Sequence, residues 1–199
     1  HADHYQTNRA YGVGAYSKGE TLLAQLAAVM GPELRDEGLK AYYRDWKFKH
    51  PGPNDFKRSM EKVCGFDLDW YFQYFIHTTH QIDYAIDRVA EGAETTTIEC
   101  SRIGAMPMPQ NITVTYTDGS ATTYVAPLVM MRGHRPLADG EALLPDWPWT
   151  HPTYSFDVPT RSGIASVELD AARQMADVDR SNNRVEFDPE INRLYERNR

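Results

Sequence analysis

The sequence predicts an α+β fold, in which an N-terminal all-helical segment of about four helices is followed by an antiparallel β-sandwich. Apolar residues recur at spacings of three and four through the first 80 positions, and they alternate with polar residues beyond Ile82. Composition changes at the same place, since residues 1–80 hold 14 of the 23 Phe, Trp and Tyr side chains. We therefore expect a helical part at 1–82, a β-sandwich domain at 83–185 and a charged tail, either a short helix or frayed, at 186–199.

The first two predicted helices are separated by Gly31-Pro32, a pair that ends one helix and starts the next. From Ser17 to Met30 the leucines and other apolar residues form the stripe of an amphipathic helix. Ser17 and Glu20 have the spacing of a capping box at its start. The second helix is expected to run from Pro32 to about Lys47 and to bury an aromatic face.

Two further helices are expected after the turn at residues 50–53, where two prolines flank a glycine. Asn54 or Asp55 can cap a third helix that runs through residue 63, and a glycine ends it. Asp67 or Asp69 can begin a fourth helix that runs to about residue 78.

The β region contains a hairpin signal, in which Asp118-Gly119 separates two β-rich runs. Further alternating stretches are bounded by turn residues and indicate six or seven short strands in total. These stretches lie at 82–89, 95–103, 154–158 and 165–169.

Charge and hydropathy exclude two classes of protein. The net charge of −7 argues against a nucleic-acid scaffold, because such proteins present a basic surface. No run approaches 18 apolar residues, so no membrane span is expected.

The chain carries no signal-peptide pattern and does not begin with methionine, so we expect a piece excised from a longer polypeptide. Cys64 and Cys100 are either two buried thiols or, if the mature protein is exported, one disulfide.

Two histidine pairs have a spacing that could suit a metal ion, because residues three apart share one face of a helix. They are His1 with His4 and His77 with His80. No H-E-x-x-H motif is present, and neither pair has an obvious third ligand. Exposed or loop histidines are therefore the preferred interpretation, and no metal site is predicted from these pairs.

The segment 177–188 resembles a calcium loop, because oxygen-bearing side chains occupy alternate positions. Asp177, Asp179, Ser181 and Asn183 form this series, and Asp188 stands at the twelfth position. The turn glycine and the closing glutamate of such loops are missing. A turn held by hydrogen bonds from side chains to backbone is the favoured interpretation.

Tyr16 is the strongest candidate for chemistry that the residues themselves suggest. It precedes the predicted helix start at Ser17 and follows two glycines, so its phenol could donate to a developing oxyanion with help from the helix dipole. The alternative is an aromatic side chain that packs in the core before a helix.

A family resemblance leads to the same tyrosine. The run RAYGVGAYSKGETLLAQLAAVMG, with the helices through DFKRSMEKVCGFDLDWYFQYFIHTT, resembles the region after the zinc site in gluzincin metallopeptidases of the aminopeptidase N type. The later runs RIGAMPMP, PLVMMRG, DWPWTHPTY and QMADVDRSNN resemble the β-rich region of bacterial members. In this family a tyrosine before x-K-G hydrogen-bonds the tetrahedral intermediate, and Tyr16 before Ser17-Lys18-Gly19 matches it. Tyr11 matches a second tyrosine, five residues upstream, that lines the substrate site in some members.

The resemblance implies a zinc metallopeptidase that hydrolyses peptide substrates, in a thermolysin-like catalytic domain followed by the sandwich. The zinc ligands, the H-E-x-x-H helix and a third glutamate, would lie outside this chain, so the fragment alone is expected to bind no catalytic zinc and to be inactive. Its partners would be the remainder of the catalytic domain or a second copy of itself, and a periplasmic or secreted bacterial protein is favoured. The alternative is a non-catalytic module in which the sandwich binds a partner; an upstream sequence without H-E-x-x-H would favour it.

Overall fold

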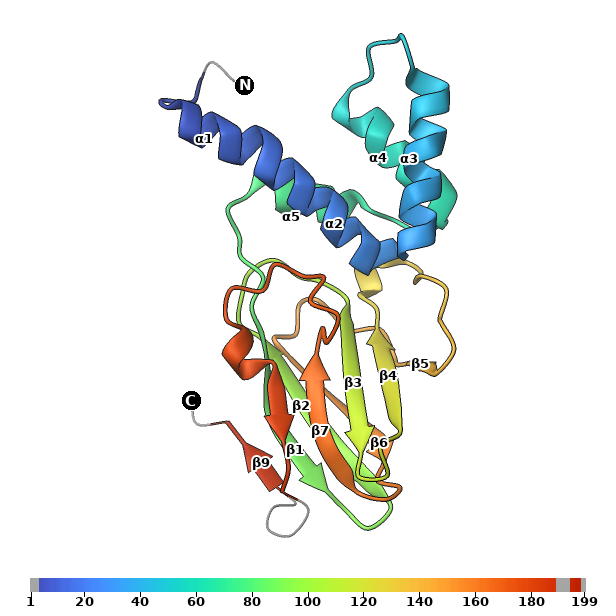
Figure 1. Cartoon of the computed structure of the whole chain (residues 1–199), viewed down its shortest axis with the longest axis vertical. Coiled ribbons are helices and arrows are strands. Elements are labelled where there is room, and N and C mark those ends of the chain that lie inside the picture. The colour runs from blue at the N-terminus through green and yellow to red at the C-terminus, as the bar shows by residue number, and fades with distance from the viewer. Residues whose placement is uncertain (1–3, 189–193, 198–199) are drawn as a thin grey trace.

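The computed structural model describes residues 4–188 and 194–197, and it consists of a helical layer seated on one end of a β-sandwich (Figure 1). The described helices are α1 (Asn8–Gly12), α2 (Lys18–Met30), α3 (Pro32–Trp46), α4 (Pro53–Cys64) and α5 (Asp69–His77). A π-helical turn, Val13–Ser17, joins α1 to α2, so that these elements form one long helix. The expected α+β class is confirmed.

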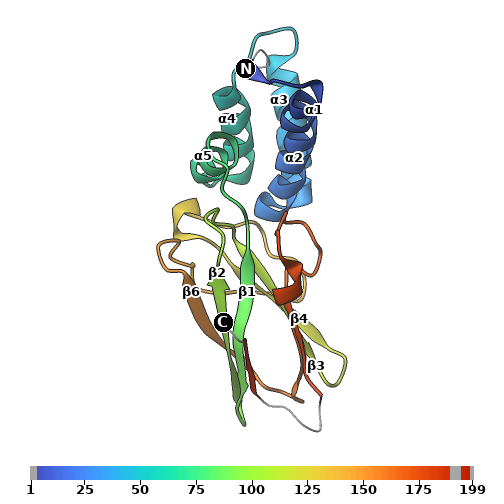
Figure 2. The ribbon, with the colours of Figure 1, turned by 90° about the vertical axis from the view of Figure 1, so that its left-hand side faces the viewer.

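The strands form two sheets that pack face to face, with the helices at one end of both (Figure 2). One sheet has the order β6-β2-β1-β9 and the other the order β5-β4-β3-β7-β8. The described strands are β1 (Tyr84–Glu91), β2 (Thr95–Arg102), β3 (Gln110–Tyr116), β4 (Ala121–Ala126), β5 (Glu141–Leu143), β6 (Thr153–Pro159), β7 (Ile164–Leu169), β8 (Arg184–Glu186) and β9 (Leu194–Glu196).

Local sequence signals account for most element ends. Pro32 starts α3 without losing an intrahelical bond, because the first N–H groups of a helix have no partner within it. Asp55 accepts a hydrogen bond from Gly52 N at 2.8 Å at the start of α4, and Gly65 ends that helix in the left-handed conformation. Gly119, with φ of 84°, makes the tight turn between β3 and β4 that the hairpin signal predicted.

Two sequence expectations are wrong. The long helix does not start at Ser17, because Asn8–Ser17 is already helical and Thr7 caps it by accepting a bond from Ala10 N at 3.1 Å. The tail is neither a short helix nor frayed throughout, because Leu194–Glu196 pair as β9 with β1. Residues 189–193 and 198–199 of that predicted tail lie outside the described residues. The sandwich also departs from a purely antiparallel one, since β4 and β5 pair in parallel.

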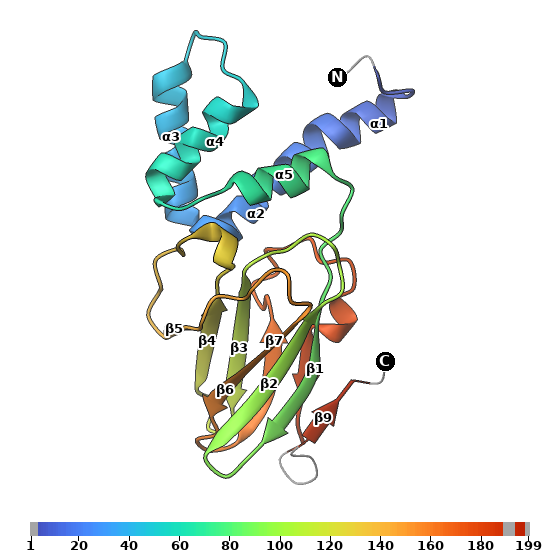
Figure 3. The same cartoon turned by 180° about the vertical axis from the view of Figure 1, so that it is seen from behind.

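One continuous group of buried side chains runs from the helices into the sandwich. Polar contacts join the two layers at its edge: Ala176 N donates to Gln25 Oε1 at 2.9 Å, and Asp67 N donates to Met131 O at 2.9 Å. The chain passes from the end of α5 to β1 through a short segment, and α5 lies in front of α2 in the view from behind (Figure 3). Among the described residues, no helix has the length and apolar character needed to cross a bilayer.

Candidate functional site

Tyr11 and Tyr16 lie on the long N-terminal helix, near the point where its hydrogen bonding changes. In the π-helical turn Lys18 N donates to Val13 O, which lengthens the turn by one residue. Such turns occur often at functional sites, because they displace side chains from regular helical positions. The turn contains Tyr16 and follows directly after Tyr11 and Gly12.

The two tyrosines belong to a row of three aromatic rings. The ring centroids of Tyr5 and Tyr11 are 5.9 Å apart at 70°, and those of Tyr11 and Tyr16 are 5.9 Å apart at 88°, both edge-to-face arrangements. A Cβ atom at Gly14 would collide with the Tyr5 phenol, so glycine at this position lets Tyr5 fold back onto the helix. Tyr5, Gln6, Thr7, Asn8 and Tyr11 surround an open hollow of about 300 Å³.

Exposure distinguishes the two interpretations of Tyr16. Its side chain is 69% exposed and that of Tyr11 is 37% exposed, so neither is a core residue. The interpretation of Tyr16 as a buried aromatic before a helix is therefore wrong. The expected help from a helix N-terminus is wrong too, because Tyr16 lies inside a helix that begins at Asn8.

The described residues do not fit a catalytic zinc ion. One group of three potential ligand side chains was found among them, formed by Glu61, Asp67 and Asp69, and it contains no histidine. Glu61 accepts a bond from Leu68 N at 3.0 Å and Asp67 one from Asp69 N at 2.8 Å. These contacts explain the acidic group as a set of caps around the start of α5. Of the histidine pairs, His1 lies outside the described residues, and His80 packs against the Tyr74 ring.

The two cysteines are separate free thiols, which settles the choice left open by the sequence in favour of thiols. Cys100 is fully buried and Cys64 is half-buried. Burial raises the pKa of both thiols, so neither resembles an activated nucleophile.

The segment 177–183 forms turns held by side chains, as the favoured interpretation expected. Asp177 Oδ1 accepts a bond from Asp179 N at 3.0 Å, and Asp179 Oδ1 accepts one from Ser181 N at 3.1 Å. The sequence did not indicate that Asp83 lies beside this segment, nor that Tyr5 joins the other two tyrosines. Both associations depend on folding, since no local pattern relates these residues.

One comparison with known proteins found a similarity in the helical part of the chain. The model of the peptidase family M1 domain matches residues 2–75, a stretch that contains all three tyrosines and ends within α5. The match relates the helical part of the chain to M1 peptidases and leaves the β-sandwich outside it. No curated protein matches the chain.

Proposed function

We propose that the helical part contributes to the active site of a zinc-dependent metallopeptidase of the aminopeptidase type, which hydrolyses peptide bonds. The single observation that carries the proposal is that Tyr16 lies at a π-helical turn, in an exposed row of aromatic rings, within the stretch similar to the M1 domain. Tyr16 is the catalytic residue of the proposal, and Tyr11 is its substrate-binding residue.

The phenol of Tyr16 would act as a hydrogen-bond donor to the oxygen that becomes negatively charged as the peptide carbonyl turns tetrahedral. A donor that is already in place stabilises this charge without reorganisation at the moment of reaction. The edge-to-face contact with Tyr11 restricts the Tyr16 ring, which supports such preorganisation. Tyr11, beside the hollow, is in a position to contact the substrate.

The zinc ion of this activity would be held by ligands outside this chain, since the chain contains no H-E-x-x-H motif. The proposal therefore includes that the 199-residue chain alone does not hydrolyse peptides. The remainder of the catalytic domain would pack on apolar side chains that the helical part leaves exposed. These include Val13 at 56% and Phe48 at 98% exposure.

The test is the hydrolysis of an aminoacyl p-nitroanilide by the longest natural polypeptide that contains this chain, with Tyr16→Phe as the variant. Loss of one oxyanion donor typically lowers kcat by about 100- to 1000-fold. Tyr43→Phe is the matched control, because Tyr43 is 68% exposed on α3 and lies outside the row of tyrosines. It should leave kcat unchanged.

A kcat for Tyr16→Phe within about threefold of the wild type would contradict the role of Tyr16. Hydrolysis by the purified 199-residue chain would contradict the assignment of the zinc ligands to another part of the polypeptide.

A further inference from the structure

Tyr5 precedes the long N-terminal helix, and its side chain folds back onto that helix in two places. Its ring centroid lies 5.9 Å from that of Tyr11, in an edge-to-face arrangement. Its phenol occupies the space that a Cβ atom of residue 14 would fill. Because Gly14 belongs to the π-helical turn Val13–Ser17, Tyr5 contacts both Tyr11 and the turn that contains Tyr16.

Gly14 is the residue that makes the second contact possible. A Cβ atom there would lie 2.8 Å from Cζ of Tyr5, whereas carbon atoms pack at about 3.5–4.0 Å. Gly12, in the same long helix, has no such neighbour within 4 Å of the corresponding position in the described structure. Glycine destabilises a helix interior relative to alanine, so a contact that only glycine admits is a physical reason for its presence. The described structure provides this reason at Gly14 and not at Gly12.

Tyr11 extends the contact from Tyr5 to Tyr16. The ring centroids of Tyr11 and Tyr16 are 5.9 Å apart, edge to face, although both side chains are more than a third exposed. An exposed aromatic side chain retains several rotamers unless neighbouring groups restrict it. Tyr11 has a ring contact with Tyr5 as well as with Tyr16, so Tyr5 restricts the side chain against which the Tyr16 ring lies.

We propose that Tyr5 is a positioning residue for Tyr16: it holds Tyr11 and the π-helical turn, and through them it fixes the direction of the Tyr16 phenol. Tyr5 acts through these groups and not on the substrate. A hydrogen-bond donor is effective only within a narrow range of distance and angle, and misplacement by about 1 Å can lower a rate by about 100-fold. The positioning role rests on the proposed function of Tyr16, but the contact itself can be tested without any activity.

The first experiment follows the ring resonances of Tyr16 by NMR, in the 199-residue chain labelled at tyrosine and assigned with Tyr16→Phe. Tyr5→Ala should shift these resonances, because Tyr11 is released and the magnetic field that its ring produces at Tyr16 changes. Tyr5→Phe keeps the aromatic ring and removes only the hydroxyl group, so it should retain the wild-type resonances of Tyr16.

Two glycine variants form a matched pair. Gly14→Ala should displace the Tyr5 ring and shift the Tyr16 resonances as Tyr5→Ala does, so it also provides the test if Tyr5→Ala fails to fold. Gly12→Ala makes the same change where the space is open, so it should raise Tm and leave the resonances unchanged. In the Tyr5→Ala background, Gly14→Ala meets no ring and should cause no further shift.

The second experiment measures hydrolysis of an aminoacyl p-nitroanilide by the longest natural polypeptide that contains this chain. Tyr5→Ala and Gly14→Ala should each lower kcat by about tenfold, with KM within about twofold of the wild type, because the donor is displaced while the substrate contacts remain. Tyr5→Phe should rescue kcat, since it restores the ring. Gly12→Ala should have the wild-type kcat. A purely structural role of Tyr5 would lower the amount of folded enzyme without changing kcat per folded molecule.

The positioning role is overturned if Tyr5→Ala and Gly14→Ala leave the Tyr16 resonances unchanged, or if both variants have the wild-type kcat. A rise in KM alone would also overturn it, because Tyr5 would then contact the substrate directly. Shifted resonances in Tyr5→Ala, together with a wild-type kcat for Tyr16→Phe, would overturn the proposed function of Tyr16 and the positioning role with it, while the ring contact would stand.

Discussion

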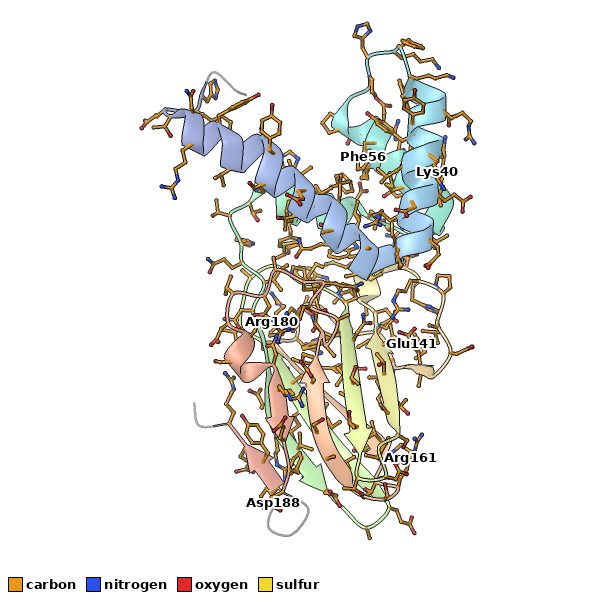
Figure 4. All side chains as sticks on the ribbon, viewed as in Figure 1. Lys40, Phe56, Glu141, Arg161, Arg180 and Asp188 are labelled. Atoms are coloured by element: carbon orange, nitrogen blue, oxygen red, sulfur yellow. The ribbon has the colours of Figure 1, made fainter. Side chains whose placement is uncertain are left out.

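Asp170 is the residue whose replacement should most clearly disturb the connection between the sandwich and the helices. It is 2% exposed and lies directly after β7, where its φ of 46° is tolerated better by Asp than by most residues. Its carboxylate accepts three hydrogen bonds at 2.9 Å, from Gln174 N, Met175 N and Arg180 Nη1. Arg180 lies at the end of the sandwich nearest the helices (Figure 4).

Asp170→Ala should lower the free energy of unfolding by about 3–5 kcal/mol. Met175 N is buried and would be left unsatisfied, at a cost of about 1–3 kcal/mol. Arg180 would lose its carboxylate partner, and removing one member of a buried ion pair costs about 3–5 kcal/mol in total. We do not add the two costs, because Arg180 is 28% exposed and water would replace part of the lost contact.

The assay is urea unfolding followed by circular dichroism and tryptophan fluorescence. For a chain of this size, 1 kcal/mol corresponds to about 2–4 °C in Tm, so a thermal melt should show a fall of about 6–20 °C. A double-mutant cycle with Arg180→Met should give a coupling energy of about 1–3 kcal/mol. A destabilisation below about 1 kcal/mol, or a coupling energy near zero, would refute the assigned role of Asp170.

Two other outcomes are expected. Hydrogen bonds from Arg135, at 2.6 and 2.7 Å, lower the pKa of Glu141, so Glu141→Gln should reduce the free energy of unfolding by about 1–2 kcal/mol at pH 7. Because the pKa of Glu141 is lower in the folded chain, this difference in stability should persist above pH 4.5 and shrink below it. A difference in stability that does not change with pH would contradict the assignment. The exposed apolar side chains of the helical part should drive self-association of the 199-residue chain. Light scattering should therefore give a mass above the monomer's 22.7 kDa. A monomeric mass together with a well-protected N-terminus would contradict this expectation.

Sequence signals within a few residues were sufficient to predict most turns and helix ends. Gly31-Pro32, Gly65 and Asp118-Gly119 mark chain reversals or helix ends, because backbone sterics act over a few residues. The helix start was missed because Gly12 and Gly14 suggest a flexible approach. In the structure, one of them instead makes room for the Tyr5 ring.

Contacts between distant parts of the chain were beyond local patterns. The strand β9 has only three residues, and it pairs with β1 through partners such as Arg88 and Glu196, whose side chains form an ion pair at 3.2 Å. No periodicity in the tail could indicate this pairing. The exposed tyrosines could be identified from sequence, because they belong to a short motif. The position of Asp83 beside 177–183 could not, since it follows from a bridge between residues 95 positions apart.

The π-helical turn makes the row of three tyrosine rings depend on how the helix is wound, as well as on which residues it contains. In a regular α-helix each residue advances the chain by about 100°, so residues five apart, such as Tyr11 and Tyr16, would point in directions about 140° apart. The wider π-helical turn, in which Lys18 N donates to Val13 O, reduces this difference and keeps the two rings in edge-to-face contact. If the same ten residues from Asn8 to Ser17 were wound as a regular α-helix, Tyr11 would turn away from Tyr16, although every tyrosine would still be present. The spacing of the tyrosines can therefore be interpreted only together with the winding of the helix between them.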